Sequence, residues 1–369
     1  MCQKLAIIGA NDFQNQLIIK AKEMGIETHV FAWEDGAVGK KNADFFYPIS
    51  IVEKEEILKK CQEIGINGIC SIASDLASIT VNYVAEKMSL IGNGIDSSII
   101  ATNKYLMRKA FEDNGDPSPK NFRSDELNEQ IINSLELPLI VKPVDRSGSR
   151  GITKITDKTQ LNDAIRIAES LSFDKKAMVE EFIEGKEYSV EYISYRGKHT
   201  FLALTEKFTT EAPHFIETGH IQPAYVSPVI LEKIQSIVSH ALDSLKIKNG
   251  ASHSEIKINT DGTIKIVEIG GRMGGDCIGS DLVQISTGYD FVKMVIDIAL
   301  GRKPDFTKIC EPRKAEVRFI ISRDDLNLLE FEKKNNPDKI YRISDIDKIS
   351  DNHKVEDSST RFGYYILAG

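Results

Sequence analysis

The sequence predicts two kinds of architecture in one chain, an α/β unit with a doubly wound parallel sheet followed by units of α+β character. Up to about residue 95, apolar β-prone runs alternate with stretches of helical periodicity. After that point the pattern is α+β, with two consecutive strands at 177–181 and 188–195 and alternating strands and helices from 199 to 300, and residues 306–369 look β-rich. Alternating strands and helices indicate a parallel sheet covered on both faces, whereas consecutive strands indicate antiparallel pairing.

The first unit is predicted to span residues 1–95. An apolar run at 4–9 precedes helical periodicity to about residue 24 and a second strand at 27–32, which is a βαβ opening. The alternation continues through a helix at 53–64, a strand at 68–72 and a helix at 76–88. These elements predict a Rossmann-like domain.

The second unit is predicted to span residues 96–305. It opens with a helix at 102–112 and a turn-rich stretch at 114–119, and a small subdomain is expected at about 113–185. Strands are predicted at 139–142, 152–155, 177–181 and 188–195, with a helix at 160–170, and from residue 199 strands and helices alternate up to residue 300. The run Arg302-Lys303-Pro304-Asp305 marks a break, after which residues 306–369 are expected to form a small β-rich closing subdomain.

Composition limits the class of partner. The 369 residues carry a net charge of −8 without a dense Lys/Arg block, which argues against nucleic acid and against an anionic membrane surface. No run approaches membrane-spanning length, the first apolar run is too short for a signal peptide, and the five cysteines lack C-x-x-C spacing. We therefore expect a cytoplasmic protein with free thiols that acts on small molecules.

Two common nucleotide motifs are missing. The segment 9–14 keeps only the first glycine of G-x-G-x-x-G, so the dinucleotide fingerprint is not met. The run 36–40 ends in Gly-Lys but lacks P-loop spacing. If the protein binds ATP, the sequence indicates another way of doing so.

The most informative stretch is 251–269. Asp261-Gly262 lies between two β-branched runs and predicts a two-residue hairpin turn. Pairing Thr260 with Thr263 places Glu255 opposite Glu268, where like charges destabilise a sheet unless something neutralises them. A solvated pair is one reading, but the Ile/Val-rich strands and the glycine-rich run that follows favour a pocket holding Mg²⁺.

Two further stretches are consistent with nucleotide binding. Lys142 ends a strand and precedes a loop of small residues at 145–151, which can place a cation and backbone N–H groups around phosphates. The stretch 179–190 joins two strands by an acidic connector that could offer backbone groups to a purine, with Glu187 near the ribose hydroxyls. Taken alone, the first could be an ordinary turn and the second an ordinary connector.

In this order, the three stretches resemble the ATP-grasp superfamily, in which two α+β subdomains clasp ATP. The resemblance covers nearly the whole chain, with the Rossmann-like unit preceding the grasp. It implies ATP and Mg²⁺, or Mn²⁺, as cofactors. The implied nucleotide and metal residues are phosphate-binding Lys104 and Lys142, a mobile phosphate loop containing Ser147, Gly148 and Ser149, an adenine hinge at Glu180, Glu181, Phe182 and Ile183, a ribose ligand at Glu187, and metal-binding Glu255 and Glu268.

Among the subfamilies, the chain most resembles the L-amino acid ligases. The run Glu217-Thr218-Gly219-His220 looks like their substrate segment, so Glu217 and His220 are expected to contact substrate. Arg272, with the backbone of Gly274 and Gly275, is expected to stabilise an oxyanion, and Lys207 to share the phosphate charge. The implied reaction activates a carboxylate as an acyl phosphate and joins it to an amine. One departure is Gly270, where many members carry a metal-binding Asn.

Other functions stay open from the sequence. Phosphoribosylglycinamide synthetases and carbamoyl-phosphate synthase-like enzymes have similar ATP-grasp chains. A module that holds ATP without turnover is a further alternative, which Gly270 favours and the intact Glu255 and Glu268 oppose. Members of the superfamily are frequently dimers, so a homodimer is compatible with the resemblance.

Overall fold

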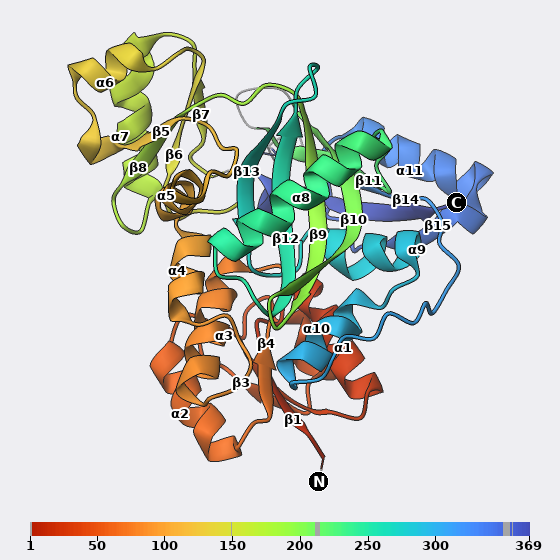
Figure 1. Cartoon of the computed structure of the whole chain (residues 1–369). Helices are drawn as coiled ribbons and strands as arrows, with labels where there is room; N and C mark the ends of the chain where they lie inside the picture. Colours follow the sequence, from red (N-terminus) through yellow and green to blue (C-terminus); the bar gives the residue numbers. More distant parts are fainter. Residues whose placement is uncertain (1, 149, 211–214, 350–354, 356) are drawn as a thin grey trace.

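The computed structural model describes residues 2–148, 150–210, 215–349, 355 and 357–369. The strands of this part of the chain form three sheets, of four, eight and four strands. Figure 1 shows the N-terminal unit at the bottom, the largest sheet in the centre and a smaller unit with α6 and α7 set to one side. Within the described residues, no helix has the length and apolar character needed to cross a membrane.

The N-terminal unit is the doubly wound α/β structure that the sequence predicts. Its sheet is parallel with the order β3-β2-β1-β4. Leu5 and Ile7 pack with α1 on one face, while Ala6 and Ile8 pack with α2 and α3 on the other, as the period of two in a strand requires. The elements are β1 (Lys4–Ile8), α1 (Asp12–Glu23), β2 (Glu27–Phe31), η1 (Val38–Asn42), β3 (Phe45–Tyr47), α2 (Lys54–Ile64), β4 (Gly68–Cys70) and α3 (Asp75–Lys87).

Two helices, α4 (Ile95–Thr102) and α5 (Lys104–Asn114), lead into the second unit, which lies inside the range predicted for the small subdomain. Its antiparallel sheet has the order β5-β8-β6-β7, and the apolar side of α7 packs on it. The elements are β5 (Asn121–Arg123), η2 (Ser124–Glu126), α6 (Glu129–Ser134), β6 (Leu139–Pro143), β7 (Thr153–Ile155), η3 (Lys158–Gln160), α7 (Leu161–Leu171) and β8 (Ala177–Glu181).

The large sheet is antiparallel, with the order β13-β12-β9-β10-β11-β14-β16-β15. Its strands are β9 (Lys186–Tyr195), β10 (Lys198–Thr209), β11 (Glu217–Gln222), β12 (Gly250–Ile258), β13 (Ile264–Gly270), β14 (Ala315–Ile320), β15 (Ile340–Ile343) and β16 (Gly363–Ala368). The helical elements that accompany it are α8 (Pro228–Ser244), the π-helical turn η4 (Ile278–Leu282), α9 (Val283–Thr287), α10 (Phe291–Ala299), α11 (Arg323–Asn335), η5 (Pro337–Lys339) and η6 (Ser358–Thr360).

Strand β9 separates an apolar face from a polar one. Tyr188, Val190 and Tyr192 pack with the apolar side of α8, which lies across this face of the sheet in Figure 1. Glu187 and Glu191 point to the opposite face, because successive side chains along a strand alternate. Polar side chains at 187, 189 and 191 alternate with apolar ones at 188, 190 and 192, so this part of the strand has one side in the core and one side available to a site.

The closing segment, residues 306–369, was predicted to be β-rich. Its three strands extend the large sheet, since β14 pairs with β11 and β16 pairs with β14. The physical reason is that β11 would otherwise leave an open strand edge, and pairing with β14 satisfies its backbone groups.

The hairpin turn also differs from the prediction. Asn259 accepts from the backbone N–H of Gly262 and donates to the carbonyl of Thr263, so the loop is one residue longer than a two-residue turn. Gly262 has a φ of +82°, which a glycine adopts without strain. A bulge between Glu255 and Ile256 then shifts the register back, and Glu255 still lies opposite Glu268.

Candidate active site

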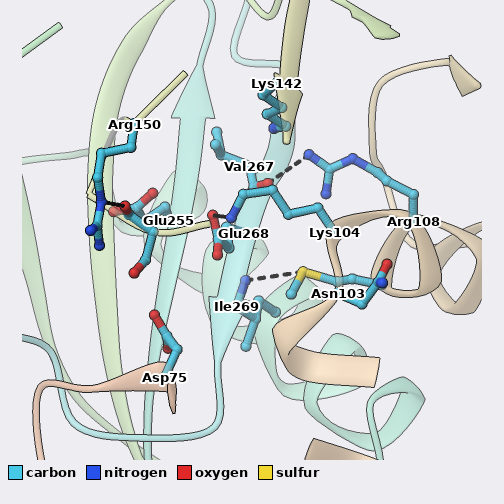
Figure 2. A network of polar contacts seen from close by, with 12 residues as sticks. Asp75, Asn103, Lys104, Arg108, Lys142, Arg150, Glu255, Val267, Glu268 and Ile269 are labelled. Atoms are coloured by element: carbon cyan, nitrogen blue, oxygen red, sulfur yellow. Dashed lines mark hydrogen bonds and ion pairs between the residues drawn. The ribbon is translucent and has the colours of Figure 1, made fainter. Parts of the chain in front are cut away.

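A cavity of about 180 Å³ lies where the three sheets meet. Its lining includes Asp75 from the start of α3, Lys142 and Glu180 from the four-stranded antiparallel sheet, and Glu255 and Glu268 from the large sheet. Figure 2 shows Asp75, Glu255, Glu268, Lys104 and Lys142 around this space. The site is thus built from elements that are far apart in the sequence.

Glu255 and Glu268 are register partners on β12 and β13, as predicted, and both line the cavity. Each carboxylate accepts a hydrogen bond from a lysine: Lys207 Nζ reaches Glu255 Oε1 at 2.6 Å, and Lys104 Nζ reaches Glu268 Oε2 at 2.6 Å. Burial raises the pKa of Glu255, but Lys207 and His253 outweigh it and hold that pKa well below its usual value. Glu255 is therefore held in its ionised form, as a cation ligand requires.

The donor chemistry at this point fits a divalent cation that is completed by other ligands. Among the described residues, no group of three or more Asp, Glu, His or Cys side chains is arranged to hold a metal by itself. Mg²⁺ in nucleotide sites is commonly held by one or two carboxylates, with phosphates and water filling the other positions. Two facing carboxylates in a cavity lined by lysines match that arrangement.

Lys207 joins three carboxylates from three strands. Its Nζ lies 2.6 Å from Glu255, 2.9 Å from Glu187 and 3.9 Å from Glu217. Burial lowers its pKa, but the three carboxylates outweigh this and raise the pKa well above the usual value. Lys207 is therefore a fixed positive charge at the side of the cavity where β9, β10 and β11 meet.

Lys142 and Glu180 form a buried ion pair that Arg108 completes. Glu180 accepts from Lys142 Nζ and from Arg108 Nε, the latter at 3.0 Å. Burial lowers the pKa of Lys142, whereas in Glu180 the nearby Arg108 and Lys142 outweigh burial and lower the carboxyl pKa. Glu180 thus orients the lysine through its side chain, whereas the predicted hinge role concerns the backbone.

The connector that follows Glu180 offers backbone groups to the cavity. Glu181, Phe182 and Ile183 line it, and no hydrogen bond joins the backbone N–H of Ile183 to another described residue. The Phe182 ring has Lys154 Nζ at 3.7 Å and Lys257 Nζ at 4.8 Å from its centroid. The hinge residues of the sequence prediction therefore lie at the cavity wall with a free donor.

The loop for which the sequence predicts phosphate binding borders the same cavity. Ser147, Gly148 and Arg150 line it, and Arg150 Nε donates to the carbonyl of Ser147 at 2.9 Å. Ser149, which the sequence prediction included, lies outside the described residues.

The two predicted substrate residues are placed differently. Glu217 lines the cavity, and its Oε2 accepts from Ser358 Oγ at 2.7 Å. His220 is buried beside Phe319 and is absent from the cavity lining. Burial, with Lys207 nearby, lowers its pKa to about 3, so the ring is neutral. The expectation that His220 contacts substrate needs correction: the ring lies on the same face of the sheet as its register partner Lys207, but it is buried beside Phe319 instead of lining the cavity.

The expectation that the backbone of Gly274 and Gly275 stabilises an oxyanion also needs correction. Neither residue lines the cavity, and the backbone N–H of Gly274 donates to Glu191 Oε2 at 3.3 Å. A Cβ at position 274 would lie 2.6 Å from His253 Nδ1. The glycine is required by close packing against a buried ion pair, so its N–H is not directed at an oxyanion.

We expect Gly274→Ala to destabilise the protein by about 1–3 kcal/mol, because the added methyl overpacks the His253–Glu191 pair. Denaturant unfolding measures this difference. Gly275→Ala is the matched control, since its Cβ would meet only Ala73 Cβ at 3.5 Å. Equal stability of the two variants would contradict the packing argument.

Three site residues, His253, Glu191 and Asp75, escaped the sequence prediction. His253 bonds Glu191 through Nδ1, and its Nε2 lies 3.5 Å from Glu255. Burial lowers the pKa of His253, but Glu191 and Glu255 raise it to about 9, so the ring adds a positive charge beside Glu255. His253 lies two positions before Glu255 on the same strand, so side-chain alternation could have placed both on one face.

The third, Asp75, pairs with Arg272, which the sequence did predict as a site residue. Arg272 donates from Nε to Asp75 Oδ1 at 2.8 Å and from Nη2 to Asp75 Oδ2 at 3.1 Å. Asp75 follows the carboxyl end of β4, the edge of a parallel sheet where ligand sites gather. This position after a predicted parallel strand could have identified Asp75 as a candidate site residue.

Comparisons with known proteins show what the chain resembles. The family model described as ATP-grasp domain matches residues 135–281. Alanine–anticapsin ligase of Bacillus subtilis (strain 168) is 28% identical over 302 residues, which cover 72% of this chain and 63% of that relative. The chain therefore spans less than two thirds of the length of this relative.

Two solved structures share the fold over the full length. L-amino acid ligase from Bacillus licheniformis aligns with a TM-score of 0.79 and 22% identity, covering 99% of this chain and 93% of that one. Phosphoribosylglycinamide synthetase from Anaerococcus prevotii aligns with a TM-score of 0.79 and 24% identity, covering 100% and 94%. At these identities the two structures establish the fold alone.

Proposed function

We propose that this chain, whose residues 135–281 match the ATP-grasp domain model, is an ATP-dependent ligase that joins a carboxylate to an amine, with an amino acid among its substrates. The observation that carries the proposal is the pair Glu255 and Glu268, face to face in a cavity that also holds Lys104, Lys142 and Lys207. Similarity to alanine–anticapsin ligase favours an amino acid over a ribose phosphate.

The nucleotide would lie along the cavity. The ammonium groups of Lys104 and Lys142 would contact its phosphates, with the loop at Ser147 and Gly148 above them. The free N–H of Ile183 would donate to the adenine ring, while Glu181 and Phe182 would line the base. Glu187 would accept from the ribose hydroxyls after exchanging its contact with Lys207.

Mg²⁺, or Mn²⁺ in its place, would be held by Glu255 and Glu268 and would offset the charge of the phosphates. In this arrangement Lys104 and Lys207, which neutralise the two carboxylates in the structure, would turn to the phosphate oxygens. The protein's main contributions to phosphoryl transfer are then positioning and charge compensation.

The reaction proceeds in two displacements. An oxygen of the substrate carboxylate attacks the γ-phosphorus, the bond to the bridging oxygen breaks, and ADP leaves. The amine nitrogen then attacks the carbonyl carbon of the acyl phosphate, loses a proton, and inorganic phosphate leaves. Arg272 would stabilise the oxyanion formed in the second displacement, and the loop at 147–151 would keep water from the acyl phosphate.

Release of ADP and phosphate with a panel of amino acids and small carboxylates tests the proposal, with mass spectrometry of the products. We expect release to require one carboxylate and one amine and to yield an amide in equal amount. Release that requires phosphoribosylamine would identify a glycinamide synthetase instead. ATP binding without release under any condition would indicate a binding module.

A further inference from the structure

The guanidinium of Arg272 lies in the space beside Gly270 that a side chain at position 270 would otherwise fill. Gly270 has no side chain, and a Cβ built there would lie 3.1 Å from Asp75 Oδ1 and 3.2 Å from Arg272 Cζ. These separations are shorter than most real Cβ contacts, so any other residue at 270 would press on the ion pair. The pair and the glycine therefore fit one another, two residues beyond Glu268 on β13.

Asp75 fixes the guanidinium in one orientation. The two hydrogen bonds of 2.8 and 3.1 Å run from adjacent nitrogens to the two oxygens of one carboxylate, the geometry that gives arginine its directional pairing. Nη1 donates to the carbonyl of Met273 at 3.3 Å. A guanidinium carries five N–H donors, and three are used here, which leaves two on the group that lines the cavity.

The partner comes from a different unit of the fold. Asp75 opens α3 of the N-terminal unit, and Ser74 caps that helix by accepting from the N–H of Ala77 at 3.2 Å. Asp75 also lies in the cavity lining with Lys104, and Figure 2 shows its carboxylate directed toward the space between Glu255 and Glu268. The N-terminal unit thus reaches the site through this side chain.

We infer that Asp75 is a positioning residue for the reaction. It holds Arg272 in the space beside Gly270, so that the two remaining guanidinium donors are available to a substrate in the cavity. This inference rests on the proposed ligase function. It assigns the N-terminal unit a part in turnover that acts through one ion pair. It also accounts for glycine at position 270, since an asparagine there would displace the pair.

A double-mutant cycle tests the inference. We expect Asp75→Asn to lower kcat for ADP release about 100-fold, the scale of a misplaced catalytic group, with the KM for ATP unchanged. Because Asp75 acts through Arg272, the double variant Asp75→Asn/Arg272→Ala should be no slower than Arg272→Ala alone. A loss in the double variant equal to the product of the single losses would overturn the inference, as would an unchanged kcat in Asp75→Asn.

Two further variants complete the design. Asp96→Asn is the matched control, because Asp96 is also an acid in the first turn of a helix but is largely exposed; its kcat should equal that of the wild type. Gly270→Ala presses a methyl group against the Asp75–Arg272 pair without removing a charge, and it should lower kcat. It therefore tests the inference even if Asp75→Asn fails to fold. A normal kcat in Gly270→Ala would then count against the inference.

The two levels of the proposal remain separable. If the wild type releases no ADP with any carboxylate and amine, the ligase function fails, and the positioning role falls with it. If the wild type is active and Asp75→Asn matches it, the ligase function stands and the positioning role alone is wrong.

Discussion

Replacement of Glu268 by Gln is expected to lower ADP release at least about 1,000-fold, with ATP and every accepted amino acid. The amide has nearly the shape of the carboxylate but carries no charge, so the proposed cation loses one of its two protein ligands. A metal ion contributes several kcal/mol to such a transfer, and each 1.36 kcal/mol is a factor of ten. Glu255→Gln should behave in the same way, because the two residues are register partners.

The control for this prediction is Glu206→Gln. Glu206 also lies on the large sheet and pairs with a lysine, Lys186, at 2.9 Å, but it does not line the cavity. ADP release is measured at saturating Mg²⁺ after circular dichroism has established that each variant is folded. Near-normal turnover in Glu268→Gln would remove the metal-binding role from this pair.

Replacement of Arg272 by Ala is expected to lower kcat by about two to three orders of magnitude, the scale of losing one donor to a developing oxyanion. The loss should fall on amide formation, which uses the guanidinium donors that Asp75 leaves free. Because the acyl phosphate then persists, water should capture more of it, and ADP should form in excess of amide. The ratio of ADP to amide, measured in one assay, reports this uncoupling.

Arg272→Lys serves as the comparison. It keeps the positive charge but cannot form the paired hydrogen bonds with one carboxylate, so it should recover little of the lost rate. An equal ratio of ADP to amide in wild type and Arg272→Ala would assign Arg272 to stabilising the fold instead.

The hairpin shows how a local prediction can succeed although one of its steps is wrong. The sequence predicted a two-residue turn, but the loop is longer, and a bulge beside Glu255 compensates for it. Val267 is the extra residue, and its carbonyl accepts from Arg108 Nη2 at 2.6 Å. The placement of Glu255 opposite Glu268 was confirmed, but turn chemistry alone could not reveal a bulge that a residue of α5 stabilises.

The errors at Gly274, Gly275 and His220 have a common origin. Each residue lies next to a motif that the sequence indicates well, and each was predicted to share the function of that motif. Packing decided otherwise, since Gly274 lies against the His253–Glu191 pair and His220 is buried beside Phe319. Which of two neighbouring residues faces a cavity depends on the layer that covers the sheet, and the order of residues along one strand does not encode that layer.

The sequence by itself determined what depends on short stretches of chain: the doubly wound opening unit, the strand-rich units after it, and two carboxylates brought together by a hairpin. Local periodicity and turn residues act within a few positions, so they can be recognised without the rest of the chain. Only the tertiary structure decided which distant groups share the site. Asp75 meets Arg272 across 197 positions, and Lys104 meets Glu268 across 164, because the packing of three sheets around one cavity brings them within hydrogen-bonding distance.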